Sequence, residues 1–173
     1  VGETDFRGTV VTFSADPEIF KQTTEYSYET LSNRLRELSF LNKGVTLTII
    51  DKREKDEKGE FVADTFKSEE GLKEFIRFLD ETREPVIANV IHMEGEKNGI
   101  PVEVAMIYNT SYSENLHSYV NNINTHEGGT HLSGFRRGLT HTLKKYADAS
   151  GMLTKLKFDI AGDDFREGLT AII

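Results

Sequence analysis

The stretch that most constrains the fold is residues 121–137, NNINTHEGGTHLSGFRR, in which two adjacent glycines precede an amphipathic segment. Such a pair is typical of a sharp turn, or of a point where another backbone comes close. Thr130 follows in the position of a helix N-cap. Beyond it, apolar residues recur at helical spacing: Phe135, Leu139, Leu143 and Tyr146. The sequence therefore predicts a strand end, a corner at Gly128-Gly129 and a long helix.

The predicted helix also carries a basic face between its apolar positions, made of Arg136, Arg137, Lys144 and Lys145. The whole chain is acidic, with 21 basic and 29 acidic residues and a net charge of −8. An acidic chain does not attract nucleic acid through its overall field, so such a contact needs a local basic patch. Arg136 and Arg137 are therefore the best anion-binding candidates, and a solvated helix face is the alternative.

The run from His126 to His131 resembles the zinc motif HExxH, but the spacing differs. Histidines five residues apart would lie roughly 140° apart around a helix, whereas the zinc motif places both rings on one face. The sequence predicts a capped turn here and no metal site. Asp163-Asp164 is interpreted as a helix cap rather than an acidic metal site. His92 and His117 are interpreted as structural residues of strands.

The pattern mixes helices with strands that follow one another directly, which predicts an α+β fold with a mixed or mostly antiparallel sheet. Helices are expected at Tyr28–Leu41, after a cap at Ser68, and briefly after Asp16-Pro17 and within residues 162–168. Asn98-Gly99 predicts a tight hairpin. Strands are expected at residues 8–13, 45–51, 61–66, 90–97, 100–108, 117–123 and 169–173.

Composition narrows the class of protein further. Hydrophobic residues make up 37% and charged residues 29% of 173, which is typical of a globular domain. We find no apolar run long enough to span a bilayer, no signal peptide and no cysteine, which fits a reducing cytoplasm. No phosphate-binding loop, dinucleotide fingerprint or nucleophile elbow is present. Because residue 1 is a valine and the last residues read as an interrupted strand, we expect a piece of a longer protein.

Three segments carry a resemblance to a known family. NNINTHEGGTHLSGFRRGLTHTL and GDDFREGLTAII resemble the second domain of the B subunit of bacterial DNA gyrase, and YETLSNRLRELSFLNKGVTLTIIDKR resembles the segment that leads into it. The resemblance implies a transducer domain with the ribosomal protein S5 domain 2-like fold. That fold is a mixed sheet with helices packed on one face and a left-handed βαβ crossover. Residues 1–44 would be the end of the GHKL-type ATPase domain with its connecting helix, and residues 45–173 the transducer, cut before its Gln-Thr-Lys loop.

The resemblance also implies a function. Gyrase is a type IIA topoisomerase that couples ATP hydrolysis to passing one duplex through another, and so supercoils DNA negatively. Thr9 and Val11 would match the strand that helps bind adenine, and Arg136, with Arg137 beside it, would face the cavity for transported DNA. No catalytic residue would fall in this chain, which is expected to be inactive alone. ATP and Mg²⁺ would serve the full-length enzyme, with neither bound here.

The implied partners are DNA, the gyrase A protein in an A2B2 complex, and a second copy of the gyrase B protein, with no membrane. Three alternatives remain open. The corresponding ATPase protein of topoisomerase IV shares nearly all these motifs. A clamp module of the MutL or Hsp90 kind pairs similar domains without topoisomerase activity. A zinc hydrolase is the most distant reading.

Overall fold

The computed structural model describes residues 3, 5, 7–9, 14–55, 57–155 and 159–173. Most of the strand expected over residues 8–13 lies outside these. The short helix expected after Asp16-Pro17 is a single turn, so that prediction is wrong. The Asp16 carboxylate accepts a hydrogen bond from the Glu18 N–H at 2.8 Å, and its carbonyl accepts from the Phe20 N–H at 2.8 Å. These bonds close the turn, and residues 21–27 do not continue it as a helix.

Helix α1, Tyr28–Leu41, has the predicted bounds. Its N-terminus is capped by Ser27, whose hydroxyl accepts a bond from the Thr30 N–H at 3.3 Å. The helix ends before Gly44, which adopts a left-handed φ of 83° that glycine tolerates without strain. Amphipathic spacing and terminal residues together were sufficient to place this element.

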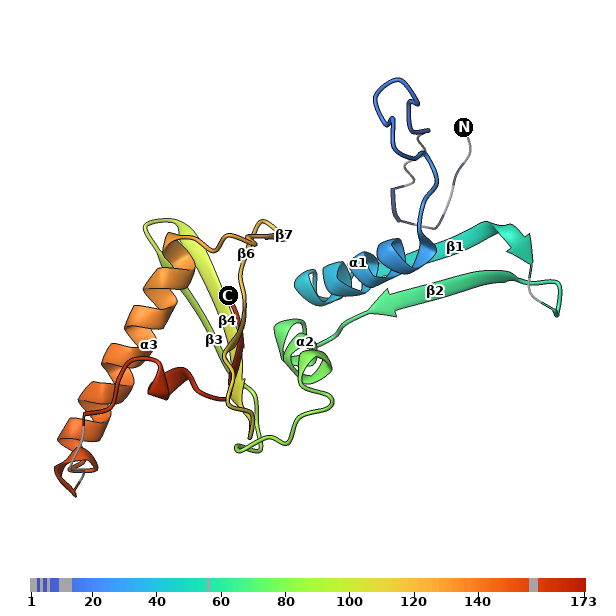
Figure 1. Ribbon diagram of the computed structural model, residues 1–173. Coiled ribbons are helices and arrows are strands. Elements are labelled where there is room, and N and C mark those ends of the chain that lie inside the picture. The colour runs from blue at the N-terminus through green and yellow to red at the C-terminus, as the bar shows by residue number, and fades with distance from the viewer. Residues whose placement is uncertain (1–2, 4, 6, 10–13, 56, 156–158) are drawn as a thin grey trace.

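Helix α1 lies along a two-stranded antiparallel sheet made of β1, Thr46–Lys55, and β2, Phe61–Lys67 (Figure 1). Strand β1, predicted at residues 45–51, extends further, to Lys55, whereas β2, predicted at residues 61–66, ends one residue later, at Lys67. The Asp64 carboxylate accepts hydrogen bonds from the hydroxyls of Tyr28 and Ser32, both at 2.9 Å, which ties the helix to β2.

A second sheet has four strands in the order β3-β4-β8-β5. Its members are β3, Ile91–Lys97; β4, Ile100–Tyr108; β5, Asn115–His117; and β8, Leu169–Ile172. Strands β3, β4 and β8 pair antiparallel, while β5 pairs parallel with β8. The predicted α+β class with a mixed sheet is confirmed. Asn98 and Gly99 close the β3–β4 hairpin with φ values of 55° and 77°, as their sequence predicts.

Helices cover both faces of this sheet, so the expectation of a single covered face is wrong (Figure 1). Helix α2, Leu72–Leu79, packs on one face, and helix α3, Thr130–Ala149, packs on the other. The α2 face contains Ala105, Ile107 and Ile172, whereas the α3 face contains Met106, Leu169 and Ala171. Successive side chains of a strand point to opposite faces, and all four residues of β8 are buried. A strand that is apolar on both sides needs a cover on both sides.

The strand expected over residues 117–123 is wrong as a single element. Two short strands replace its second half: β6, Tyr119–Val120, and β7, Ile123–Asn124. The residues between them, Asn121 and Asn122, have φ values of 50° and 65°. Asparagine enters this left-handed region more readily than most residues, so the pair forms the hairpin turn.

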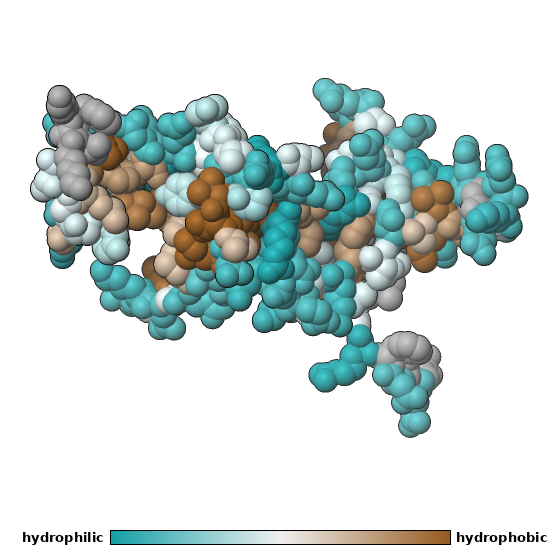
Figure 2. All heavy atoms as spheres, turned by 90° about the horizontal axis from the view of Figure 1, so that it is seen from below, coloured by the Kyte–Doolittle hydropathy of each residue, from teal (hydrophilic) through white to brown (hydrophobic). Residues whose placement is uncertain are grey.

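The cap predicted at Ser68 lies further from its helix than expected. Its hydroxyl accepts a bond from the Gly71 N–H at 2.8 Å, and α2 begins only after Gly71, whose φ is 62°. Short 3-10 turns occupy Leu153–Lys155 and Asp164–Arg166. Among the described residues, no helix is both long enough and apolar enough to cross a membrane. The side of the molecule shown in Figure 2 is mainly hydrophilic, with a few separate hydrophobic patches.

Candidate functional site

The predicted glycine corner exists, but its parts differ from the prediction. Gly128 has a φ of 75°, and a Cβ there would lie 3.3 Å from Leu132 Cδ2. Gly129 stands at the N-cap, so the expected cap at Thr130 is wrong, and α3 begins at Thr130 itself. A Cβ on Gly129 would lie 2.8 Å from the His131 ring. Glycine at both positions therefore lets the chain turn tightly into α3.

The two histidines of the HExxH-like run do different things. His126 is exposed, whereas the His131 Nε2 lies 3.4 Å from the Thr125 hydroxyl beside the corner. Within the described part of the chain, neither belongs to a cluster of three or more metal-ligand atoms. The side chains support the interpretation of a polar turn.

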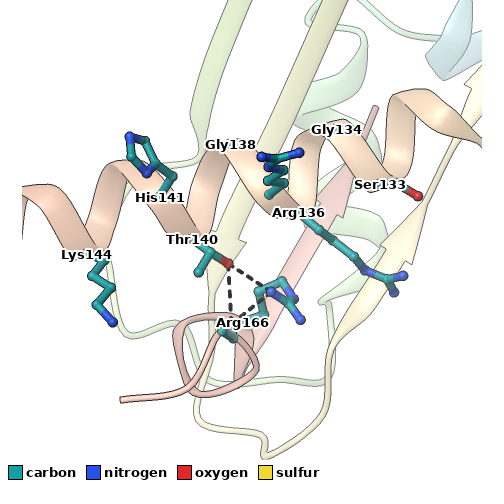
Figure 3. A pocket seen from close by; sticks show the side chains of 10 residues that line it. Ser133, Gly134, Arg136, Gly138, Thr140, His141, Lys144 and Arg166 are labelled. Atoms are coloured by element: carbon teal, nitrogen blue, oxygen red, sulfur yellow. Dashed lines mark hydrogen bonds between the residues drawn. The ribbon is translucent and has the colours of Figure 1, made fainter. Parts of the chain in front are cut away.

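A shallow groove of about 860 Å³ runs along α3 (Figure 3). One wall is the helix from Ser133 to Lys144, and the other contains Gly162 and Arg166 of the segment that returns towards β8. The helix contributes Gly134 and Gly138, one turn apart, where an added Cβ would meet nothing within 4 Å. The groove is open because glycines stand where side chains would fill it.

Among the residues described, the groove is lined by four basic side chains and one imidazole, and by no acidic side chain: Arg136, Arg137, Lys144, Arg166 and His141. Arg137, Lys144 and His141 are exposed, whereas Arg136 is half-buried. Arg136 and Arg137, which the sequence singled out, therefore line one groove. The structure adds Arg166, which had not been predicted from the sequence.

Arg166 is the most firmly held of these side chains, with 13% of its side-chain surface exposed. Its Nη1 donates to the Thr140 hydroxyl at 2.9 Å and to the Gly162 carbonyl at 2.8 Å (Figure 3). Its Nη2 pairs with Asp163. Its Nε lies 2.8 Å from Glu114 Oε1 but lacks hydrogen-bond geometry, so this contact is an ion pair only. Asp163, predicted as a cap, instead binds this arginine.

Glu114 joins the two walls of the groove. Its Oε1 accepts from Arg136 Nε at 3.1 Å and its Oε2 accepts from Arg136 Nη2 at 2.8 Å. The same carboxylate neutralises part of the charge of Arg166. By contrast, Arg137, Lys144 and Lys145 have no ion-pair partner within the described ranges. Ion pairs with Glu114 therefore hold Arg136 and Arg166 in place, whereas the other three cations lie at the surface without such a pair among the described residues. The sequence holds one signal for Arg166: it follows Asp163 by three residues in DDFR, a spacing at which the two side chains can form an ion pair.

Of the two predicted nucleotide residues, only Thr9 lies within the part of the chain that the structure describes. Thr9 is exposed and belongs to no helix or strand, and Val11 lies outside the described residues. Among the described residues, Thr9 does not line the groove.

Polar contacts connect α1 with the β6–β7 hairpin that leads into the corner. Arg34 Nη2 donates to the Asn122 carbonyl at 2.7 Å, and Asn122 Nδ2 donates to Asn42 Oδ1 at 2.8 Å. The Tyr119 hydroxyl donates to the Glu37 carboxylate. Burial, and then this bond to Glu37, raise the pKa of Tyr119. These contacts span about 80 residues of sequence and were not predicted.

A family model described as DNA gyrase B matches residues 71–173. Over all 173 residues the chain is 64% identical to the DNA gyrase B protein of Eisenibacter elegans and 61% identical to that of Cytophaga hutchinsonii, and it covers 36% of each. It is 46% identical to the DNA gyrase B protein of Staphylococcus aureus and covers 26% of that protein. The chain therefore spans about a third or less of the length of these relatives.

Two solved structures have similar folds. One is the 43K ATPase domain of Thermus thermophilus gyrase B in complex with an aminocoumarin, with a TM-score of 0.75 and 28% identity over 91% of this chain and 41% of that chain. The other is the B-subunit of the DNA gyrase from Myxococcus xanthus, with a TM-score of 0.75 over 98% of this chain and 47% of that chain. At 22% identity the second shows the fold alone.

Proposed function

The chain belongs to the DNA gyrase B family, and from that premise we propose that it is the part of an ATP-dependent type IIA topoisomerase that relays nucleotide state to DNA strand passage. The observation that carries the proposal is the groove on α3. Four basic side chains line it, and one glutamate fixes two of them. An acidic chain that gathers cations on one helix has a local surface suited to a polyanion.

The groove supports contact with a DNA backbone rather than reading of bases. Arg137 and Lys144 are exposed cations that can approach phosphates. Glu114 already holds Arg136 and Arg166 in place. These side chains therefore lose little further conformational entropy when they contact a phosphate. Such contacts depend on charge and are indifferent to sequence, which suits a duplex that passes through the enzyme.

The contacts of α1 support the relay. Arg34 and Glu37 hold the β6–β7 hairpin, and that hairpin leads through Thr125 into Gly128 and α3. We propose that a displacement of α1 moves the hairpin and with it the start of the basic helix. Two sites can be coupled in this way when a packed element has two arrangements that both sites influence.

The remaining roles follow from the family. In the full-length protein, residues 1–44 would end the ATPase domain and residues 45–173 would form the transducer. Thr9 and Val11 would help bind the adenine of ATP, with Mg²⁺ bound elsewhere in the longer protein. A second copy of the gyrase B protein and two copies of the gyrase A protein, in an A2B2 complex, would complete the enzyme in the cytoplasm.

The test is the variant Arg136→Ala in the intact enzyme, with Lys145→Ala as the matched control. Lys145 is an exposed cation of the same helix that does not line the groove. We expect Arg136→Ala to lower the number of supercoiling events per ATP hydrolysed, while basal ATPase remains near that of the control and the protein stays folded, with a loss of about 1 kcal/mol at most for the missing ion pair with Glu114. Equal losses of ATPase and stability would show instead that Arg136 is a structural residue.

Two further assays define the activity. Negative supercoiling by the complete complex supports gyrase, whereas decatenation without supercoiling would indicate topoisomerase IV. The 173-residue chain alone should hydrolyse no ATP above background. Turnover by the purified chain would contradict the division of roles proposed here.

A further inference from the structure

The β3–β4 hairpin gathers three metal-ligating side chains on one of its faces. His92 and Glu94 are two residues apart on β3, so both point to the same side. Glu94 stands directly opposite Glu103 of β4 in the antiparallel register. His92 stands opposite Ala105, which places all three side chains on the face that α2 covers further along the sheet.

The ligand atoms of these side chains converge. One nitrogen or oxygen from each of His92, Glu94 and Glu103 lies within 4.8 Å of the others. His92 Nε2 is 2.8 Å from Glu103 Oε1 and 3.7 Å from Glu94 Oε1. Ligands bound about 2.1 Å from one ion, at angles near 90–110°, lie roughly 3.0–3.4 Å apart. The two observed separations, 2.8 and 3.7 Å, lie just below and just above that range. Small rotations of the side chains would bring both into it.

The charges at this place also favour a cation. Directly opposed carboxylates on neighbouring strands repel each other. Within the part of the chain that the structure describes, neither Glu94 nor Glu103 pairs with a lysine or arginine. A groove of about 710 Å³ opens beside them, lined by Glu94, Glu96 and Glu103 and, among described residues, by no basic side chain. Two negative charges are thus held together with only an imidazole between them.

The cluster stands on a regular antiparallel strand pair. Seven residue pairs join β3 and β4, from Ile91↔Met106 to Lys97↔Ile100. The Asn98-Gly99 turn fixes their register, because a one-residue slip would move every side chain to the other face. The side chain of His92 is 19% exposed, which leaves its ring little freedom to turn away.

We propose that His92, Glu94 and Glu103 bind a divalent transition-metal ion such as Zn²⁺, with water in the remaining positions. Imidazole nitrogen and carboxylate oxygen are ordinary zinc ligands. Mg²⁺ and Ca²⁺ prefer oxygen ligands alone, so they should compete poorly. The site lies away from the groove on α3, and it stands whether or not the chain serves a topoisomerase.

The test is calorimetric titration of the 173-residue chain with Zn²⁺ alone, repeated in excess Mg²⁺. We expect one ion per chain at micromolar concentration, with affinity that falls as the pH is lowered because the ligands must be deprotonated. His92→Ala and Glu103→Gln should each weaken binding at least tenfold. His126→Ala, which removes an exposed imidazole elsewhere, should leave it unchanged.

Circular dichroism of each variant separates loss of the site from loss of the fold. In the NMR spectrum of the folded chain, the His92 ring signals should shift on addition of Zn²⁺ while those of His141 remain. Absence of saturable binding would overturn the proposal, because the three groups would then form only a protein-internal ion pair. Binding that persists in both His92→Ala and Glu103→Gln, or that disappears in His126→Ala, would overturn it equally.

Discussion

The two faces of the four-stranded sheet are covered in different ways. On the α2 face, Phe75 and Ile76 are 4% and 0% exposed, and the Phe75 ring stacks on Phe40 at 5.1 Å. On the α3 face, the helix contributes the half-buried Phe135 and Leu139, and beyond them the groove begins. Helix α2 is attached by an apolar contact, and α3 is attached by a smaller apolar contact supplemented by ion pairs.

This difference originates in the helices rather than in the sheet. Strand β8 is buried on both sides, so each face offers a comparable apolar surface. Helix α2, LKEFIRFL, packs large apolar side chains against the sheet. Helix α3 instead carries glycines and arginines beside its apolar stripe. Burial of apolar surface supplies most folding free energy, and polar groups at a groove supply contacts for a ligand. We therefore expect the α2 face to determine stability and the α3 face to determine function.

The largest expected effect is a loss of stability on the α2 face. Ile76→Ala should lower the free energy of unfolding by about 2–5 kcal/mol, because it leaves a cavity around a fully buried side chain. Leu143→Ala, at a half-buried position of α3, should cost about 1 kcal/mol. Urea unfolding of both variants measures the contrast. Equal losses would remove the distinction between the faces.

A smaller effect is expected from the carboxylate that joins the groove walls. Glu114→Ala removes the bidentate partner of Arg136 and the charge beside Arg166, and should cost about 1–2 kcal/mol. Glu127→Ala, at an exposed position near the corner, should change the unfolding free energy by less than about 0.5 kcal/mol. If the two variants were equally stable, the ion pairs would contribute nothing to the attachment of α3.

A smaller change still concerns Tyr119. At neutral pH, Tyr119→Phe should cost about 0.5–1.5 kcal/mol, because Glu37 loses a hydrogen bond. The raised pKa of Tyr119 means that the folded state holds the phenol proton more tightly than the unfolded state. This contribution is therefore fully present below about pH 10 and declines as pH rises above it.

Unfolding measured between about pH 8 and 11 checks this sign. The wild type should lose stability above about pH 10 more steeply than Tyr119→Phe. Tyr112→Phe is the matched control, since Tyr112 is 89% exposed and should follow the wild-type curve. A Tyr119→Phe profile parallel to the wild type would show that the phenol does not couple to folding.

The smallest effect on stability should come from the exposed edge of the groove. Arg137→Ala should change the free energy of unfolding by less than about 0.5 kcal/mol. In the intact protein this variant should lose about one phosphate contact with duplex DNA. The slope of log binding constant against log salt concentration should therefore become shallower by about one. Binding measured across a salt series, with Lys145→Ala alongside, checks this. An unchanged slope would remove Arg137 from the proposed interface.

Local patterns predicted elements well where a short stretch determines its own structure. Tyr28–Leu41 and the Asn98-Gly99 hairpin needed only spacing and turn chemistry. The strand expected at residues 117–123 failed because two asparagines can form a turn, and nothing local distinguishes that from a polar strand. Arg166 was missed because Glu114 and Thr140 reach it from distant parts of the chain. Likewise, the covering of both faces depends on how β8 inserts between β4 and β5.

The central place of β8 also has a consequence for how the chain folds. Its residues pair with β4 about 60 positions earlier, as in Tyr108↔Leu169. Pairings between such distant residues slow folding, because the entropy of closing a long loop is lost before the strand contacts stabilise the chain. During synthesis, the β3–β4 hairpin can form while the edge of β4 still lacks its neighbour. That edge is a template for pairing with other chains until β8 is synthesised. A ribosome-bound intermediate that ends before Leu169 should therefore be the form of this chain most prone to aggregate and most dependent on chaperones.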